Sequence, residues 1–202
     1  RSDRDWSSDV CSSDLNQEAK VLLEKCIALD PNSDLALSDL ASCHLLGLMW
    51  NWYDEPAKAL EASRQAAQKA IAINDRNVAA LQCLANIDAI SQKFDAAVSK
   101  ARRALSLAPN SPDAHGTLGG CLTLACEWEE AMEELNTAIH LGPRNPMNAM
   151  WYAFMQVCLF QERRYEECIQ WCDDAIKDLP NTLPAVHRPM AASYAMLERM
   201  DE

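Results

Sequence analysis

No run of apolar residues in the sequence approaches the length of about 18 that a membrane-spanning helix needs. Lysine and arginine are scarce as well, since 18 basic residues stand against 30 acidic ones and the formal net charge is −12. A protein that holds phosphate backbones needs clustered basic side chains. We therefore expect neither a membrane nor a nucleic acid as the partner.

Histidine is also scarce, and the four histidines are scattered singly along the chain. A zinc site needs converging thiolate or imidazole ligands, and Cys168 and Cys172, four residues apart, share a helix face without a third ligand nearby. Other cysteines, such as Cys26, stand where alanine recurs elsewhere, and free cysteine packs there as a small apolar residue. The sequence thus predicts no metal, no cofactor and a reducing, cytoplasmic setting.

What the chain does contain is a regular spacing of helix ends. The residues that follow these ends lie 44, 34, 34 and 37 residues apart, and they are Pro31, Asp75, Pro109, Pro143 and Pro180. Small residues repeat at the same interval, because Ala97 and Ala104 correspond to Ala131 and Ala138 after a shift of 34. Such self-similarity indicates stacked structural repeats.

The 3.6-residue spacing of apolar residues, interrupted by Pro, Gly and Asn, predicts paired helices. They are expected at 16–29, 34–49, 56–73, 77–91, 94–107, 111–125, 128–141, 146–161, 165–178 and 184–198. Each connection holds an Asn or Ser that can cap the next helix. No segment is rich in strands, and no nucleophile or paired-carboxylate motif is recognisable, so we expect a protein without enzymatic activity.

These periods and small residues resemble the tetratricopeptide repeat, a helix–turn–helix unit of about 34 residues. The resemblance implies an all-α, right-handed α-solenoid of helix–turn–helix repeats over residues 16–202. The expected units are about 16–33, 34–77, 78–111, 112–145, 146–182 and 183–202. One such unit cannot bury its apolar face alone, so the stacked units produce a binding surface.

The first 15 residues do not follow the repeat. All residues from Asp5 to Leu15 match one reading frame of a common short-read sequencing adapter, and we expect residues 1–15 to be a non-native, disordered segment. The sequence from Leu197 onward resembles the beginning of another repeat that stops early. We therefore expect a fragment of a longer bacterial reading frame from a metagenome.

A narrower resemblance rests on three stretches in order: Gly47–Trp52, Gly142–Pro146 and Ala185–Arg188 with Ala191–Tyr194. They are similar to the carboxy-terminal repeat region of bacterial class III adenylate/guanylate cyclases and related winged-helix transcriptional regulators. This resemblance implies the partner-binding arm of a multidomain signalling protein. The alternative is the repeat arm of an enzyme such as a glycosyltransferase or a peptidase.

In tetratricopeptide proteins the first helix of each unit lines the binding groove, and the resemblance carries that role to a strip of residues here. The strip consists of Ala79, Gln82, Cys83, Asn86, Asp113, Gly116, Thr117, Gly120, Met150, Ala153, Phe154 and Val157. It contains no Lys or Arg, and Gly116 and Gly120 leave room for a ligand backbone. We expect a neutral or basic, partly apolar protein or peptide segment, or a neighbouring domain of the parent chain.

An alternative site is the extra length in the second unit, where three aromatic residues stand within four positions: Trp50, Trp52 and Tyr53. These aromatic side chains could form a ligand-binding patch. The interpretation we favour is that they fold back and seal an adjacent helix end, since Trp and Tyr combine an apolar ring with a polar handle.

Overall fold

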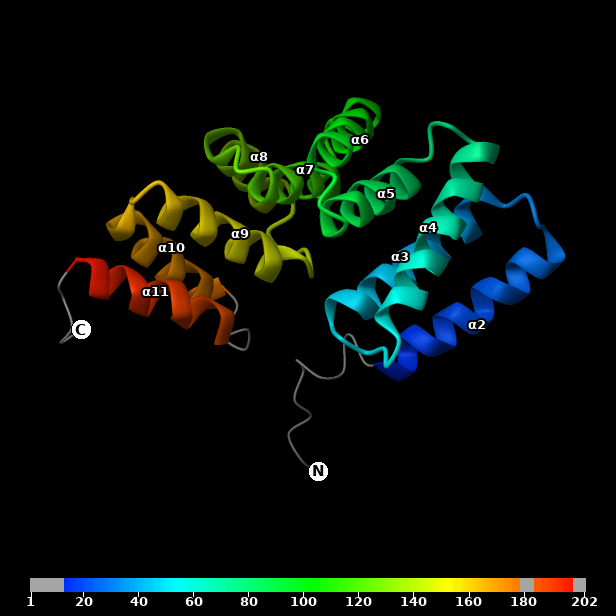
Figure 1. Cartoon of the computed structure of the whole chain (residues 1–202), viewed down its shortest axis with the longest axis horizontal. Helices are drawn as coiled ribbons and strands as arrows, with labels where there is room; N and C mark the ends of the chain where they lie inside the picture. Colours follow the sequence, from blue (N-terminus) through cyan, green and yellow to red (C-terminus); the bar gives the residue numbers. More distant parts are fainter. Residues whose placement is uncertain (1–12, 179–183, 198–202) are drawn as a thin grey trace. The chain divides into compact units, whose positions relative to one another are not determined.

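A computed structural model describes residues 13–178 and 184–197, and within these ranges every regular element is an α-helix. The chain divides into two compact units, the first ending at Leu107 and the second beginning at Ala108. The all-α class of stacked helical repeats predicted from the sequence is confirmed (Figure 1).

The first unit contains five helices among its described residues. They are α2 (Ser13–Leu29), α3 (Asp34–Met49), α4 (Pro56–Ile73), α5 (Val78–Ile90) and α6 (Phe94–Leu107). Helix α3 packs against α4, and α5 packs against α6, so each pair forms one hairpin. Helices α3 and α5 also contact each other, and α2 packs against α3. We call α3 and α5 first helices, and α2, α4 and α6 second helices.

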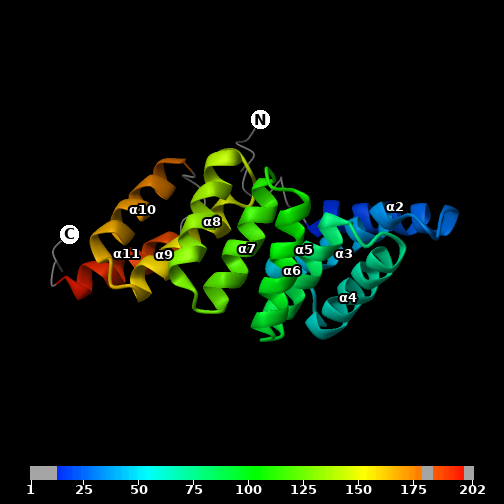
Figure 2. The same ribbon diagram turned by 90° about the horizontal axis from the view of Figure 1, so that it is seen from above.

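The second unit repeats this arrangement. Its helices are α7 (Pro112–Leu124), α8 (Trp128–Leu141), α9 (Asn148–Gln161), α10 (Tyr165–Asp178) and α11 (Pro184–Met196). The pairs are α7 with α8 and α9 with α10, while α11 packs against both α10 and α9 (Figure 2). The first helices of this unit are therefore α7, α9 and α11.

Most predicted helix bounds agree with the structure within two residues. The exception is the start of α2, because Ser13, Asp14 and Leu15, expected to precede the fold, are helical. Asp14 in the first turn is favourably placed against the positive end of the helix dipole. Residues 1–12 lie outside the described residues.

Side-chain caps begin several helices as the connections predicted. The backbone N–H of Ala36 donates to Ser33 Oγ at 3.3 Å, and that of Ala80 donates to Asn77 Oδ1 at 2.9 Å. Ser111 caps α7 in the same manner. Each cap satisfies one of the backbone donors that a helix start leaves unpaired.

Four second helices bury the same three positions against their own first helix. We call these positions the inner triad, and all of their residues are at most 1% exposed. The inner triads are Ser63, Ala67, Ala70; Ala97, Ala101, Ala104; Ala131, Leu135, Ala138; and Cys168, Cys172, Ala175. All of these residues except Leu135 are small and let the paired helices approach closely, which is why the alanine spacing was visible in the sequence.

The turn inside each complete hairpin contains one residue with a left-handed backbone. The φ angles are 55° at Asn51, 59° at Gln92, 64° at Cys126 and 58° at Arg163. Each of these residues follows the end of a first helix, where a left-handed residue closes the last turn. Glycine is absent from all four positions.

Candidate partner-binding surfaces

The predicted strip in the first unit lies on α5, and its side chains differ in accessibility. Cys83 is buried with its Sγ 3.3 Å from Ser42 Oγ, and burial raises the pKa of its thiol to about 11. Gln82 and Ala79 are half-buried, and Gln82 Nε2 is buried without a hydrogen-bond partner among the described residues. Asn86 is also half-buried and has a polar side chain.

In the second unit, aromatic side chains of α9 cover the two glycines of the predicted strip. A Cβ atom added to Gly116 would lie 2.2 Å from the Trp151 ring, and one added to Gly120 would lie 2.9 Å from the Phe154 ring. The expectation that these glycines leave room for a ligand backbone is therefore wrong. Their physical role is to let α7 and α9 pack closely through the aromatic rings.

Asp113, the one acidic residue of the strip, is engaged by the next connection. Its Oδ1 accepts a hydrogen bond of 2.9 Å from Asn145 Nδ2, which ties the start of α7 to the loop before α9. Thr117, one turn further along α7, is half-buried. The carboxylate of Asp113 is exposed but is not a free charge for a ligand.

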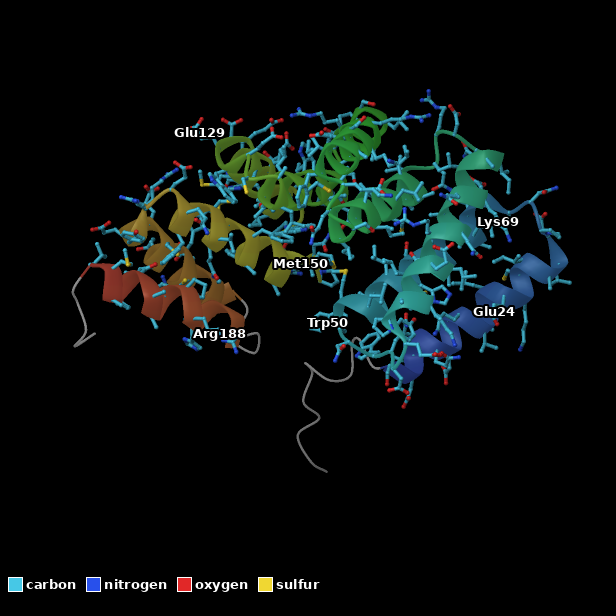
Figure 3. The ribbon with its side chains drawn as sticks, in the orientation of Figure 1. Glu24, Trp50, Lys69, Glu129, Met150 and Arg188 are labelled. Atoms are coloured by element: carbon cyan, nitrogen blue, oxygen red, sulfur yellow. The ribbon has the colours of Figure 1, made fainter. Side chains whose placement is uncertain are left out.

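The accessible part of the strip on α9 is apolar. Val157 is 41% exposed, while Met150, Ala153 and Phe154 are half-buried. Met150 lies near the start of α9 (Figure 3). A flexible methionine on the same helix as the exposed Val157 and the half-buried Phe154 suits an adaptable apolar contact.

Two exposed apolar residues were missing from the predicted strip. Ile90 is 50% exposed at the end of α5, and Leu124 is 42% exposed at the end of α7. They occupy the same repeat position, since they lie 34 residues apart. The repeat spacing itself was the signal that could have identified them.

The aromatic residues of the loop between α3 and α4 differ in their contacts, because Tyr53 packs against the protein and Trp50 is exposed. Tyr53 packs on Gly47, where an added Cβ would lie 2.4 Å from the Tyr53 ring, and its hydroxyl accepts a hydrogen bond of 3.2 Å from Lys20 Nζ. This Lys20 ammonium also lies 4.7 Å from the centre of the Tyr53 ring. Tyr53 thus seals α3 against α2, as favoured above, whereas Trp50 is 49% exposed (Figure 3) and Trp52 is half-buried.

In the first unit, the buried carboxylate of Asp88 on α5 pairs with cations from two other helices. It accepts hydrogen bonds from Arg64 Nη1 of α4 at 3.1 Å and from Lys100 Nζ of α6 at 2.6 Å. Burial raises the pKa of Asp88, but the hydrogen bonds from Lys100 and Arg64 outweigh it and hold the pKa below its usual value. This cluster links three helices and is structural.

No group of three or more potential metal ligands occurs among residues 13–178 and 184–197. Cys168 and Cys172 belong to an inner triad and are fully buried. None of the described helices is long and apolar enough to cross a membrane. The surfaces that remain as candidates are the first-helix strip and the exposed tryptophan of the loop.

Comparison with protein families supports the repeat assignment. Residues 88–156 match the tetratricopeptide repeat family. Among curated proteins, the transcriptional regulator HilA of Salmonella typhimurium (strain LT2) is 29% identical over 127 residues, which is 63% of this chain and 23% of the regulator. HilA of Salmonella typhi matches equally. The chain thus spans less than a quarter of the length of these relatives.

Solved structures with similar folds cover most of the chain. TTC0263, a thermophilic repeat protein of Thermus thermophilus, has a TM-score of 0.69 at 17% identity, covering 89% of this chain and 91% of that one. YrrB, described as having an unusual peptide-binding site, has a TM-score of 0.59 at 18% identity, covering 88% and 84%. PilF of Pseudomonas aeruginosa has a TM-score of 0.61 at 18% identity, covering 93% and 85%. At these identities the likeness concerns the fold.

Proposed function

Because the chain is a tetratricopeptide-repeat protein, we propose that it is a protein-interaction scaffold whose first helices bind a segment of a partner protein. The observation that carries this proposal is that first helices of each unit have accessible apolar side chains: Ile90 is 50% exposed in the first unit, and Leu124 and Val157 are 42% and 41% exposed in the second. Stacked helical repeats of this kind present binding surfaces along their helices.

The strip also restricts the chemistry of the partner. Its accessible side chains are apolar or neutral, and its one carboxylate, Asp113, already accepts a hydrogen bond from Asn145. No Lys or Arg of the strip is available to hold an acidic tail. The partner is therefore a neutral or basic, partly apolar peptide segment or a neighbouring domain of the parent chain, and the strip offers no clustered cations for a nucleic acid.

The parent protein is a multidomain bacterial signalling protein, with these repeats as its partner-binding arm in the cytoplasm. The match to the transcriptional regulator HilA supports a transcriptional regulator over a cyclase as the output. The alternative is the repeat arm of an enzyme such as a glycosyltransferase or a peptidase. The repeats themselves carry no catalytic role in this proposal.

Peptides selected against the chain from a random display library provide a defined probe of the strip. Their affinity is measured by fluorescence anisotropy for the parent chain and for Val157→Ser and Asn86→Ala. Val157→Ser tests the strip of the second unit and Asn86→Ala that of the first, and the substitution in the unit that binds the peptide should weaken binding about tenfold or more, as expected when a central interface contact is lost. Gln65→Ala, an exposed change on α4, is the control and should leave the affinity unchanged.

Trp50→Ala separates the two candidate surfaces. If only this change abolishes peptide binding, the aromatic loop is the site and the strip assignment is wrong. Unchanged affinity in Val157→Ser and Asn86→Ala would likewise contradict the proposal. Circular dichroism of each variant establishes that the helices remain formed.

A further inference from the structure

The α9–α10 hairpin buries a polar side chain where the two preceding hairpins have almost no side chain. Counted back from the left-handed turn residue of each hairpin, Gln156 of α9 corresponds to Ala85 of α5 and Gly119 of α7. Gln156 is 0% exposed. Neither Nε2 nor Oε1 of its amide has a hydrogen-bond partner in the part of the chain that the structure describes. A buried amide without partners destabilises a fold, so this one calls for a role beyond packing.

Two thiols of α10 lie against this amide. In the preceding hairpin, a Cβ added to Gly119 would lie 2.6 Å from Leu135 Cγ, and the inner-triad residue that corresponds to Leu135 is Cys172. One turn earlier, Cys168 Sγ donates a hydrogen bond of 3.7 Å to the backbone C=O of Gln156. Both cysteines are 0% exposed. Residues four apart share a helix face, with Cβ atoms about 5–6 Å apart, so the two sulfurs can reach one atom between them.

Helix α11 brings a second buried polar group to the same place. Ser193 of α11 is 0% exposed, and the Cys168 thiol adjoins both Ser193 and Cys172. Ser193 Oγ makes no hydrogen bond to any described residue. Helix α11 packs against α10 and α9 (Figure 1). Three helices therefore bring two thiols together with two polar side chains that packing leaves without partners.

We propose that Cys168 and Cys172 bind one copper(I) ion between their two sulfurs. Thiolates are soft ligands that select soft ions such as Cu(I), and two of them can hold this ion in a near-linear arrangement. Binding replaces the two thiol protons, so that Cu⁺ and two S–H groups give one copper bis-thiolate and two released protons. No oxidation or reduction is involved.

The two unpartnered side chains fit the charge of this complex. Two thiolates and one Cu⁺ have a net charge of −1, which is costly in a protein core unless hydrogen-bond donors face it. The Nε2–H of Gln156 and the Oγ–H of Ser193 supply such donors. Groups of this kind orient and tune metal ligands without binding the metal themselves.

Zinc suits the same residues less well. A structural zinc ion takes four ligands, ordinarily cysteine, histidine or carboxylate side chains. No group of three or more such residues occurs within 13–178 and 184–197, whereas copper(I) is satisfied by two thiolates. The site is buried and the first-helix strip is accessible, so copper binding does not depend on the proposed scaffold function.

The test uses a reference chain in which three other thiols that could capture copper are changed to serine. Cys26 and Cys126 are exposed, and Cys11 precedes the described residues. Copper(I) is titrated without oxygen in competition with bathocuproine disulfonate, a chelator whose copper complex is coloured. The reference chain should take one copper(I) ion from the chelator and show a higher urea midpoint when loaded.

Cys168→Ala and Cys172→Ala remove the two ligands one at a time. The α5–α6 hairpin has alanine at both positions, as Ala97 and Ala101, so the variants keep side chains that this repeat already packs. Each variant should lose the copper ion and the increase in urea midpoint. Cys158→Ala, which removes a buried thiol that pairs with Thr123, is the matched control and should keep both.

Gln156→Leu tests the amide donor at nearly constant volume. It should weaken copper affinity about tenfold or more, while the urea midpoint of the metal-free chain stays equal or rises, because no unpartnered amide remains in the core. Titration with Zn²⁺ against a coloured zinc chelator should show weaker binding than copper(I). The proposal is overturned if the reference chain binds no copper, if either cysteine variant keeps it, if Cys158→Ala loses it equally, if Gln156→Leu leaves the affinity unchanged, or if zinc binds more tightly.

Discussion

The two units hold neighbouring repeats together with different side chains. In the first unit, Asp88 of α5 joins α4 and α6 through its ion pairs with Arg64 and Lys100. In the second unit, Trp151 of α9 fills the space above Gly116 of α7. The first link is a buried carboxylate between two cations, and the second is a large ring against a residue without a side chain.

The difference shows that the repeat requires contact between neighbouring hairpins without prescribing its chemistry. A charged link depends on ionisation and on the geometry of its hydrogen bonds. A link made by close packing, such as that of the Trp151 ring on Gly116, depends on shape and not on pH, because it contains no ionisable group. The two units should therefore respond differently to core truncation and to acid.

Removing the ring of Trp151 is expected to have the largest effect. Trp151 is 3% exposed, and its loss leaves a cavity between α7 and α9. Trp151→Ala should lower the free energy of unfolding by about 3–5 kcal/mol, the range for large aromatic residues in a core. Urea unfolding followed by circular dichroism measures the change.

The same substitution at Trp50 is the matched control. Trp50 is 49% exposed at the end of α3, so Trp50→Ala should cost about 0.5 kcal/mol or less. Equal losses at the two tryptophans would show that Trp151 does not carry the contact between α7 and α9. Aromatic packing would then not be the link between neighbouring hairpins in the second unit.

Removing the charged link of the first unit should cause the second-largest loss in the free energy of unfolding. Asp88→Ala leaves Arg64 and Lys100 without their shared acceptor, and we expect a loss of about 2 kcal/mol, reduced because both cations are partly exposed. Asp39→Ala, an exposed change on α3, is the control and should cost less than about 0.5 kcal/mol. Urea midpoints at neutral pH give both values.

Acid should remove the contribution of Asp88 in a defined direction. Its pKa in the folded protein lies below the ordinary value because the hydrogen bonds from Lys100 and Arg64 outweigh the effect of burial. The stabilisation is therefore complete above the unfolded-state pKa of about 3.9 and is lost as the pH falls through the lower folded value. The difference between the parent chain and Asp88→Ala should shrink below about pH 4. A constant difference across that range would contradict the assignment.

The fold was largely readable from the sequence, because small residues such as Ala97 and Ala131 recur at the buried positions of the inner triads. The roles of Gly116 and Gly120 were not readable. A glycine on a first helix is equally compatible with room for a ligand and with a close helix contact, and the choice depends on aromatic rings that come from α9. Asp88 was missed for a related reason, since its partners Arg64 and Lys100 lie on two other helices.

The smallest expected effect concerns the left-handed residue in each hairpin turn, a feature that the two units share. It tests whether the difference between the units extends to their turns. Gln92 in the first unit and Cys126 in the second have left-handed backbones, with φ of 59° and 64°. A left-handed residue with a side chain costs about 1–2 kcal/mol, and glycine avoids this at an entropic cost of about 0.5–1 kcal/mol. Gln92→Gly and Cys126→Gly should each raise the free energy of unfolding by about 0.5 kcal/mol, measured as an increased urea midpoint. Asn51→Gly is the control and should change little, because asparagine tolerates this conformation. A gain in one unit with a loss in the other would mean that the turns, like the links between hairpins, differ between the units.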